Sequence, residues 1–557
     1  MKKIILILSF VIIALSSCSD YIEEDNRSSA TTDEYLKASG FEGLVNVNYS
    51  QLREIYGNEP WLFVAGTDLY SEGRGLEPPG VSQYAILTPS STNIDFLYRE
   101  CYKAIVKANT ALYFANLTEK TTTLPSRILE VRYLRANAYF VLVQTYGGVP
   151  LELDYNPTPK TSFTRNTAQE IYSFIVKELE EITPDLGTVA YSGRVNKRAA
   201  QDLLAKVYLT RGYEAFGEAS DFTKAASYAD AAINGQALTI PYADLWAPGF
   251  ATTVKGDTNS EVIFSAKFSA ASVSTNPQTL GNSQGSYFGS YLGGPEVSGK
   301  SPQRIYSLCL TDHAISLFEQ GDKRWEATFM TEIFTNYYDL YSTTADKSPS
   351  KVKRFYAPKW FTPNDEAAYL NSHPQLKINA ADPKSVLSTY RRYGTYSSQN
   401  TETSDFNMIC VRKFDDPTAP YATTGSSRVS TRDFIISRLS DTYLIAAEAY
   451  FKAGNPLALT RLNAVRARAG VPNATAAQLN IDYILDERAR EMIGEYNRWF
   501  DLKRTNKLIE RTSLYNPKVQ SVNFDGANGE KKILRPIPQE TIDLNKNKDF
   551  PQNPAYL

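Results

Sequence analysis

The stretch 433–504 decides how the rest of this sequence is interpreted. It begins DFIISRLSDTYLIAAEAYFKAGNPLALTRLNAVRARAG (433–470) and, after a short loop, continues ILDERAREMIGEYNRWFDLKR (484–504). In the first part, apolar residues recur at three- and four-residue steps, which places them on one face of a helix. Gly454 and Pro456 end that helix, and a second helix follows. The apolar face of the first helix consists of Leu439, Tyr443, Ala446, Ala447, Tyr450 and Phe451.

Two short antiparallel helices joined by so tight a turn resemble a tetratricopeptide-type hairpin, which cannot bury its apolar face alone. The sequence should therefore contain other hairpins, and one Ala-Tyr-Gly spacing of this hairpin does recur. Further helix pairs are expected at 95–146, 167–212 and 198–235. We expect about four pairs, which form a scaffold over about 95–235 and 433–510. The two matching sets are Ala205, Tyr208, Gly212 and Ala447, Tyr450, Gly454.

Two regions have a different character. Helical periodicity is weak over 241–430, where Gly, Ser, Thr, Pro and Tyr are dense and short strands are expected at 261–268 and near 408–414. A second loop-rich segment covers 61–92. Long irregular segments usually carry function, so we expect the ligand-binding residues here. The predicted fold class is mainly α: a tetratricopeptide-like α-solenoid scaffold with a large, irregular, loop-rich insertion that contains small β elements.

The composition of the chain argues against several kinds of functional site. The chain has 557 residues and a formal net charge of −2, which predicts no basic surface for nucleic acid. His313 and His373 are its two histidines. The chain therefore has almost no histidine available for Ser-His-Asp or Cys-His catalysis or for zinc sites with several His ligands. The chain has 37 Tyr and 5 Trp, whose flat apolar faces suit carbohydrate rings and protein partners alike.

The N-terminus has the pattern of a secretory signal. Two lysines precede an apolar run over 4–15, which is too short to span a bilayer as a mature helix. Small residues then precede Cys18 as in a lipobox, so we expect residues 1–17 to be removed and Cys18 to be acylated. The alternative is an ordinary signal peptide cleaved near this point. Residues 18–32 are polar and acidic and are expected to form a flexible tether, and 33–557 to form a single domain.

Four segments resemble the SusD/RagB family of outer-membrane nutrient-uptake lipoproteins. They follow the family's order, and together with the lipobox the resemblance covers essentially the whole chain. In the last segment, Ala555 stands where Gly is usual in that family. The segments are RLSDTYLIAAEAYFKAG (438–454), LTRLNAVRARAG (459–470), ILDERAREMIGEYNRWFDLKR (484–504) and RPIPQETIDLNKNKDFPQNPAYL (535–557).

The resemblance implies a lipoprotein that is exposed at the cell surface and anchored to the outer membrane through Cys18. Members of this family work with a SusC-like TonB-dependent transporter, to which they deliver a bound nutrient, usually a glycan. They are binding proteins and not enzymes, so we expect no catalytic residue, no cofactor and no metal. The implied fold has four tetratricopeptide-like pairs that support an irregular ligand-binding region.

No family motif fixes the ligand-binding residues, so the candidates depend on residue type and place. The loop after Trp61 offers an acid, a Tyr and an Arg among glycines, which supplies hydrogen-bond partners and a stacking face for a sugar. A turn packed on the next helix is the alternative. Aromatic residues of the insertion form the second group, and each of them could instead be core. The candidates are Asp68, Tyr70, Glu72, Arg74, Tyr287, Tyr291, Trp325, Tyr356 and Trp360.

Two acidic clusters could have a catalytic or cation-binding role. Glu487 and Glu491 lie one helical turn apart, which could serve acid–base catalysis. Glu and Arg at three- and four-residue steps also make an ordinary helix ion network, and we interpret the cluster as such a network. Asp415 and Asp416 could help to bind a cation, but the sequence Asp-Asp-Pro first of all predicts a turn.

The sequence therefore favours a surface protein that binds an oligosaccharide or polysaccharide and works with a transporter. Three alternatives stay open: a peptide as cargo, a scaffold subunit without a glycan site of its own, and a surface glycan hydrolase. The hydrolase would need two carboxylates about 5 to 9.5 Å apart in an aromatic cleft.

Overall fold

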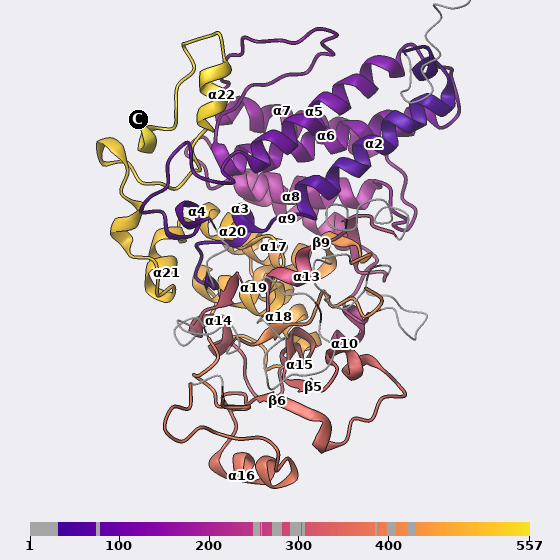
Figure 1. Cartoon of the computed structure of the whole chain (residues 1–557). Coiled ribbons are helices and arrows are strands. Elements are labelled where there is room, and N and C mark those ends of the chain that lie inside the picture. The colour runs from indigo at the N-terminus through magenta and orange to yellow at the C-terminus, as the bar shows by residue number, and fades with distance from the viewer. Residues whose placement is uncertain are drawn as a thin grey trace, which may run out of the picture.

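A computed structural model of the chain describes most of its length (Figure 1). Cys18, Arg74 and Tyr291, three residues to which the sequence analysis gave a role, lie outside the described residues. Within the described part, every helix is too short or too polar to cross a membrane. The described residues are 32–73, 78–248, 257, 259–269, 281–289, 302, 307–384, 387–397, 408–419 and 430–557.

Helices that pack one against the next, in chain order, form the part of the molecule that we call the helical frame (Figure 1). Its first members, α2 to α9, lie side by side across the upper half of the view, and α17 packs against α9. The frame consists of α2 (Ala38–Tyr56), α5 (Phe96–Ala115), α6 (Leu124–Tyr146), α7 (Ala168–Ile182), α8 (Lys197–Arg211), α9 (Asp221–Ile233), α17 (Leu439–Lys452) and α18 (Leu457–Ala469).

The frame confirms the predicted solenoid of four pairs but divides its first helices differently: the expected pairs 95–146 (α5 with α6) and 167–212 (α7 with α8) are wrong, whereas 198–235 is correct. Besides each neighbour, α2 contacts α6, α6 contacts α8, and α8 contacts α17, so these four helices form one inner row. The pairs are therefore α2–α5, α6–α7, α8–α9 and α17–α18. The sequence analysis paired the two helices of 95–146, because the long segment 57–95 hides that α2 and α5 are partners in space.

Small residues make these close helix contacts possible. Ala225 and Ala229 of α9 and Ala446 and Ala449 of α17 are all fully buried. Alanine leaves room for two helix axes to approach, since the interaxial distance depends on the side chains at the contact. The α7 helix starts at a capping box, in which the Thr167 side chain accepts from the Glu170 backbone N–H and Glu170 reaches back to Thr167.

The insertion between α9 and α17 consists of short elements, as predicted. Its strands pair β2 with β9 and β4 with β8 antiparallel, and β5, β6 and β7 form a three-stranded sheet in which β6 and β7 are parallel. β3 pairs antiparallel with β1, which comes from the loop after α3. The strands are β1 (Tyr70–Glu72), β2 (Val262–Ala266), β3 (Leu308–Leu310), β4 (Phe329–Met330), β5 (Glu332–Phe334), β6 (Val352–Tyr356), β7 (Tyr390–Arg391), β8 (Cys410–Val411) and β9 (Phe434–Arg438).

Short helices complete the insertion and the C-terminal part. In Figure 1, α16 marks the end of the molecule opposite the frame, and α19 lies between the frame and the insertion. The short helices are α3 (Trp61–Val64), α4 (Pro79–Gln83), α10 (Tyr242–Leu245), α13 (Gln284–Tyr287), α14 (Asp312–Ser316), α15 (Arg324–Thr328) and α16 (Pro363–Ser372). The C-terminal helices are α19 (Ile481–Met492), α20 (Arg498–Arg504), α21 (Leu508–Tyr515) and α22 (Gln539–Leu544).

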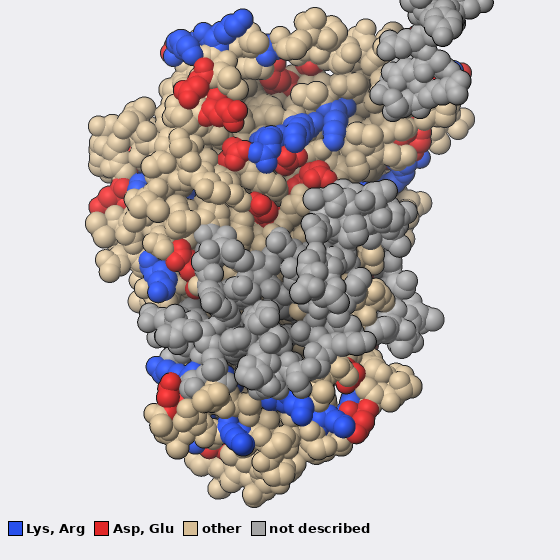
Figure 2. Space-filling model, viewed as in Figure 1, with Lys and Arg blue, Asp and Glu red and all other residues tan. Residues whose placement is uncertain are grey.

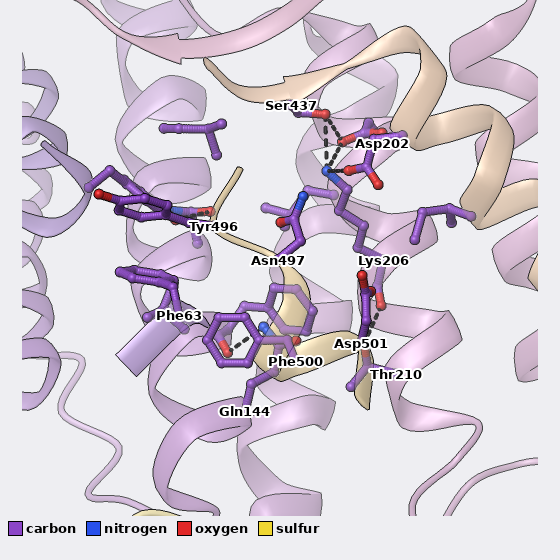
Figure 3. Close-up of a pocket in the computed structure, with 18 of the residues that line it drawn as sticks. Phe63, Gln144, Asp202, Lys206, Thr210, Ser437, Tyr496, Asn497, Phe500 and Asp501 are labelled. Carbon is purple, nitrogen blue, oxygen red and sulfur yellow. Dashed lines mark hydrogen bonds and ion pairs between the residues drawn. The ribbon is translucent and has the colours of Figure 1, made fainter. Parts of the chain in front are cut away.

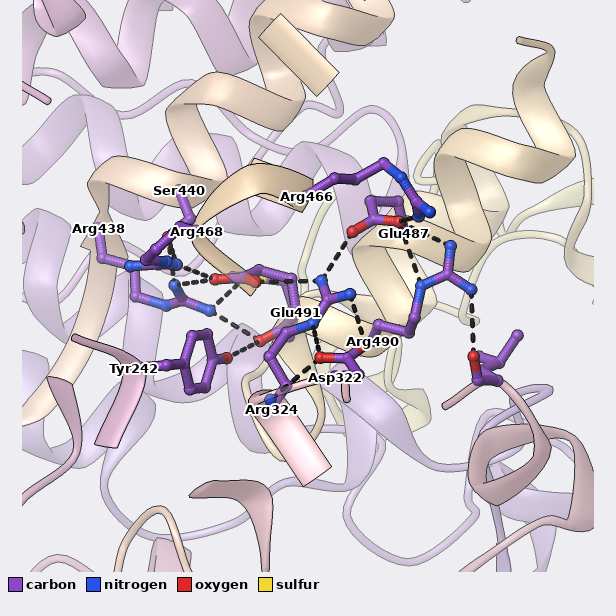
Figure 4. A network of polar contacts seen from close by, with 12 residues as sticks. Tyr242, Asp322, Arg324, Arg438, Ser440, Arg466, Arg468, Glu487, Arg490 and Glu491 are labelled. Atoms are coloured by element: carbon purple, nitrogen blue, oxygen red, sulfur yellow. Dashed lines mark hydrogen bonds and ion pairs between the residues drawn. The ribbon is translucent and has the colours of Figure 1, made fainter. Parts of the chain in front are cut away.

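The insertion is fastened to the frame by a buried charge network centred on α19 (Figure 4). The carboxylate of Glu491 lies 2.7 Å from Arg438 Nη1 and 2.5 Å from Arg468 Nη2. Arg324, from α15 of the insertion, contacts both Glu487, at 2.7 Å, and Glu491, at 3.4 Å. These side chains are almost completely excluded from solvent. The structure therefore confirms the interpretation of the α19 carboxylates as an ion network.

The network holds its carboxylates in the ionised form. Burial alone would raise the pKa of Glu487, but the charge of Arg324 and of two further arginines lowers that pKa to about 2. For Glu491 the balance is the same: its arginine neighbours outweigh burial and keep the pKa far below its ordinary value. A carboxylate held in this way cannot serve as a general acid or base near neutral pH.

Candidate ligand-binding site

The described part of the loop that carries four of the candidates, residues 61–73, is largely internal. Asp68 is fully buried, and its carboxylate lies 2.6 Å from Arg498 Nη2 and 2.8 Å from Arg511 Nε. These two arginines outweigh the effect of burial and hold the pKa of Asp68 well below its usual range. Asp68 thus joins the first loop to α20 and α21, and the structure does not support its expected contact with a ligand.

Tyr70 and Glu72 end this loop in strand β1. Tyr70 is fully buried, and its hydroxyl oxygen accepts a hydrogen bond from the Gly494 N–H at 2.5 Å, so this ring also belongs to the core. Glu72 is half-buried and accepts hydrogen bonds from Ser82 and from Gln83 Nε2, the latter at 2.7 Å. Of the described candidates in this loop, Glu72 is the one at the surface.

Three aromatic candidates of the insertion are core residues. The Tyr287 hydroxyl donates to the Asn58 carbonyl at 2.7 Å, and the Tyr356 hydroxyl donates to the Met408 carbonyl at 3.0 Å. Trp325 is 2% exposed and packs edge-to-face on Phe329. The structure corrects the expectation that these rings face a ligand, because the buried hydroxyls and rings are used to hold the insertion together.

Trp360 differs from these three residues. It is half-buried, and its ring lies 5.3 Å from that of Trp325 at an interplanar angle of 70°. The buried tryptophan thus supports one side of Trp360 and leaves part of the ring at the surface. The sequence did not distinguish the two, because both are tryptophans in a loop-rich region.

The residues around Trp360 gather on helix α14, and we call this set the α14 patch: Asp312, Lys359, Trp360, Tyr393 and Ser397. At the C-terminal end of α14, Lys359 Nζ donates to the Ser316 carbonyl at 2.6 Å. At the N-terminal end, the Ser397 hydroxyl donates to the Asp312 carboxylate. Tyr393 is 39% exposed, and burial together with Asp312 raises the pKa of its hydroxyl, which therefore stays protonated at neutral pH.

Strand pairing fixes α14 in place. The helix follows β3 directly, and its N-cap residue Thr311 accepts the Ala314 N–H and donates to the Asp68 carbonyl at 2.6 Å. Through β3 the helix is tied to β1, whose last residue is Glu72. Glu72 and the α14 patch therefore lie at opposite ends of one two-stranded ribbon, since Glu72 pairs with Leu308 and α14 follows Leu310.

The α14 patch offers partly exposed aromatic rings beside the Asp312 carboxylate and the Lys359 ammonium group, whereas the buried Ser397 hydroxyl holds Asp312 in place. This combination suits a ligand that presents apolar faces edged by hydroxyl groups, such as a sugar. Sequence analysis singled out Trp360 of the patch and missed the other four members. The Tyr-rich run around Tyr393 and the Lys-Trp pair 359–360 were the available signals, but neither shows that both lie against α14.

Two other features, His313 and the Asp415–Asp416 pair, are bonded within the protein and are not assigned to a ligand site. His313 stacks on Tyr515 with 3.7 Å between ring centroids, and Arg511 lies 2.9 Å from its Nε2 atom. Asp415 accepts the Tyr337 hydroxyl at 2.9 Å, and Asp416 caps a turn by accepting the Thr418 N–H. Over the described stretches of the chain, no cluster of three or more His, Cys, Asp or Glu side chains could hold a metal ion.

A cavity inside the frame is too small for a glycan (Figure 3). Its volume of about 90 Å³ is equivalent to roughly three water molecules. Lys206 Nζ lies on its wall, 3.0 Å from Asp202 and 2.8 Å from Asp441. We assign this cavity to the packing of α8 and α17 against β9 and not to a ligand.

Comparisons with known proteins show the family of this chain. The family profile described as the SusD family matches residues 260–556, and a second profile, described as starch-binding associating with outer membrane, matches residues 20–209. The chain belongs to the SusD family. Two similar relatives come from Formosa agariphila: SusD-like protein P2 is 22% identical over the full length of both chains, and SusD-like protein P38 is 23% identical over 89% of this chain and 90% of that one.

Solved structures, among them SusD-like and SusD superfamily proteins, share the fold. A laminarin binding SusD-like protein superimposes with a TM-score of 0.66 at 22% identity, covering 93% of this chain and all of that one. A SusD superfamily protein from Parabacteroides distasonis gives 0.67 at 23% identity over 95% of this chain and all of that one. A third structure, described with a xylogluco-oligosaccharide, gives 0.65 at 18% identity, covering 93% of this chain and 99% of that one.

Proposed function

We propose that this SusD-family chain is a cell-surface lipoprotein that captures a glycan and delivers it to a SusC-like TonB-dependent transporter in the outer membrane. Family membership over both halves of the chain is the observation that carries the proposal. One similar structure described as laminarin binding, and another described with a xylogluco-oligosaccharide, support a glycan as the cargo.

The anchor belongs to the same proposal. Acylation of Cys18 would tether the protein to the outer membrane through a chain of about 14 residues before the first described helical turn, Thr32–Leu36. The association with the outer membrane agrees with the description of the second family profile. Metabolic labelling with a palmitate analogue tests this step, because Cys18→Ser should abolish the label.

The chemistry of the α14 patch supports binding without turnover. Near it, the α19 carboxylates are neutralised by arginines, and the Asp68 carboxylate is enclosed by Arg498 and Arg511. Asp312 accepts a hydrogen bond from Ser397 and contributes hydrogen-bonding capacity to the patch. We therefore assign the patch to recognition of the glycan and not to its hydrolysis.

Surface charge agrees with a neutral ligand. Among the described residues on the face shown in Figure 2, the Lys and Arg side chains are interspersed with Asp and Glu and form no large field of one sign. Such a surface neither attracts nor repels a polyanion strongly. Neutral plant, algal or storage polysaccharides are thus the first class to test.

The experiment is affinity gel electrophoresis of the protein without its anchor, in gels that contain laminarin, xyloglucan, starch, pectin, alginate or mucin glycans. We expect retardation in at least one gel and no release of reducing ends from that polysaccharide. Recovery of a TonB-dependent transporter by pull-down without retardation in any gel would favour the scaffold alternative. Steady release of reducing ends by pure protein would favour the hydrolase.

A further inference from the structure

A groove on the helical frame, remote from the α14 patch, has the composition of a second carbohydrate site. Its volume is about 500 Å³, within the range of ligand-binding clefts. Three segments form its walls: the α5 helix, residues 150–163, and the C-terminal residues 541–550. We call it the frame groove. In Figure 1 it belongs to the end of the molecule that carries α5 and α22, opposite α16.

The frame groove is preformed. The Tyr102 hydroxyl on α5 donates to the Pro150 carbonyl at 2.7 Å, and Asn109 Nδ2 donates to the Glu152 carbonyl at 3.0 Å. On the other side, the Asn545 side chain accepts the Phe163 N–H and donates to the Phe163 carbonyl, both at 3.0 Å. A ligand would meet walls that are already ordered, which lowers the entropic cost of binding.

Aromatic rings line the groove and remain partly open. Tyr102, Tyr155 and Phe163 are each half-buried, and Val106, one helical turn from Tyr102, is 62% exposed. Tyr155 is held in place by stacking on Tyr113, with ring centroids 4.6 Å apart and an interplanar angle of 27°. Rigid, partly exposed tyrosines of this kind offer flat faces on which the apolar face of a sugar ring can rest.

Polar groups border the same rings. Nine of the 19 lining residues are polar or charged and are not tyrosines, and the Glu152 carboxylate and Lys160 ammonium pair at 2.7 Å on the rim. Asn109 and Asn545 are buried and bonded within the wall, but a lipid chain or an apolar helix would have to desolvate the other seven without replacing their hydrogen bonds, which costs free energy. A sugar ring meets both requirements, since it has apolar faces and hydroxyl edges. The polar lining residues are Asn109, Thr110, Glu152, Asp154, Asn156, Thr158, Lys160, Thr541 and Asn545.

We propose that the frame groove binds an oligosaccharide segment of the same glycan that the α14 patch binds, as a second, independent site. This inference rests on the proposed function, because it takes the cargo to be a glycan. Two sites on one rigid chain would hold a polymer more tightly than either alone, since the second contact forms at a high effective concentration. Short oligosaccharides, which cannot bridge the sites, would fill them separately.

The test is isothermal titration of the protein with oligosaccharides prepared from the polysaccharide that retards it most in the gel panel. We expect two oligosaccharides per chain for the wild type and one per chain for Tyr155→Ala. Thr110→Trp, which fills the groove and keeps its tyrosines, should also leave one. Either variant should bind the polymer about tenfold more weakly. The partly exposed Tyr450→Ala on α17 is the control, expected to keep both sites.

The outcomes separate this inference from the proposed function. One oligosaccharide per wild-type chain, unchanged in Tyr155→Ala and Thr110→Trp, would overturn the second site and leave the proposed function intact. Retardation by no polysaccharide of the panel would overturn both. Loss of a protein partner from a pull-down, with sugar stoichiometry unchanged in the two groove variants, would also overturn the second site, because the groove would then be a protein interface.

Discussion

The helical frame and the insertion are stabilised by different interactions. In the frame, fully buried alanines such as Ala229 and Ala446 let one helix approach the next over its whole length. The insertion has short strands and helices, and it is fastened to the frame by few, buried ion pairs such as those of Arg324 with α19. The frame and the insertion share one apolar core, but repeated helix contacts build the frame, whereas the buried charges of the insertion converge on one helix, α19.

The largest expected effect comes from removing one charge of the network. Glu491→Gln leaves Arg324, Arg438 and Arg468 buried without their shared carboxylate, which should lower the free energy of unfolding by about 3–5 kcal/mol. Chemical denaturation of the variant measures this. The matched control is Glu510→Gln, at a carboxylate that is 62% exposed and paired with Lys507, where the change should stay within about 0.5 kcal/mol. Equal small effects in the two variants would contradict the role given to α19.

Acid should loosen the same network. Glu487 has a pKa of about 2 in the folded protein against an ordinary value near 4.5, so the unfolded chain binds the proton first as the pH falls. The stability contributed by Glu487 is complete above pH 4.5 and is lost as the pH falls through about 2, to the extent of about 3 kcal/mol. Urea unfolding at pH values from 7 to 3 checks the sign. Glu487→Gln should flatten this dependence, and an unchanged slope in that variant would argue against the assignment.

An overpacked helix contact should be less damaging. Ala229→Leu inserts three carbon atoms at a fully buried site on α9, which should cost about 1–3 kcal/mol. Ala231→Leu, at an exposed position on the same helix, should change the melting temperature little. Scanning calorimetry of both variants provides the comparison. If Ala231→Leu were the more harmful of the two, the packing order of the frame would be wrong.

The smallest effect on stability, and the direct effect on function, is expected at the α14 patch. Trp360→Ala should weaken binding of the retarding polysaccharide about tenfold, or about 1.4 kcal/mol, because it removes the exposed part of a supported ring. The melting temperature should change by no more than a few degrees, since the ring is only half-buried. Leu514→Ala, at a side chain that is 67% exposed on α21, is the control that should retain full affinity. Full affinity in Trp360→Ala would remove the patch from the site.

The fold could be predicted from the sequence because the patterns that indicate each helical hairpin are local. Apolar steps of three and four residues, glycine stops and small residues at helix contacts predict the hairpins within windows of about 15 residues. The division into pairs was the exception, at 95–146 and 167–212. Helices α2 and α5 are neighbours in space but are separated by the segment 57–95, and no local pattern shows that contact.

The candidate site was much harder to predict from the sequence, because the burial of a side chain depends on partners that are distant in the chain. Asp68 is enclosed by Arg498 and Arg511, which are more than 400 residues away in the sequence. Trp325 and Trp360 are equivalent by residue type, yet one is core and the other reaches the surface. Recognition of the family supplied the function class, whereas only the three-dimensional arrangement brings Tyr393 and Ser397 to α14.

The central claim is that the insertion carries a ligand site, the α14 patch, while helices α8, α9 and α17 of the frame provide support. Hydrogen–deuterium exchange with and without the retarding polysaccharide tests it most directly. We predict slower exchange at 312–316, 358–361 and 393–397 on binding, and unchanged exchange in α8, α9 and α17. Slower exchange confined to those three helices, with 312–316, 358–361 and 393–397 unaffected, would contradict the account.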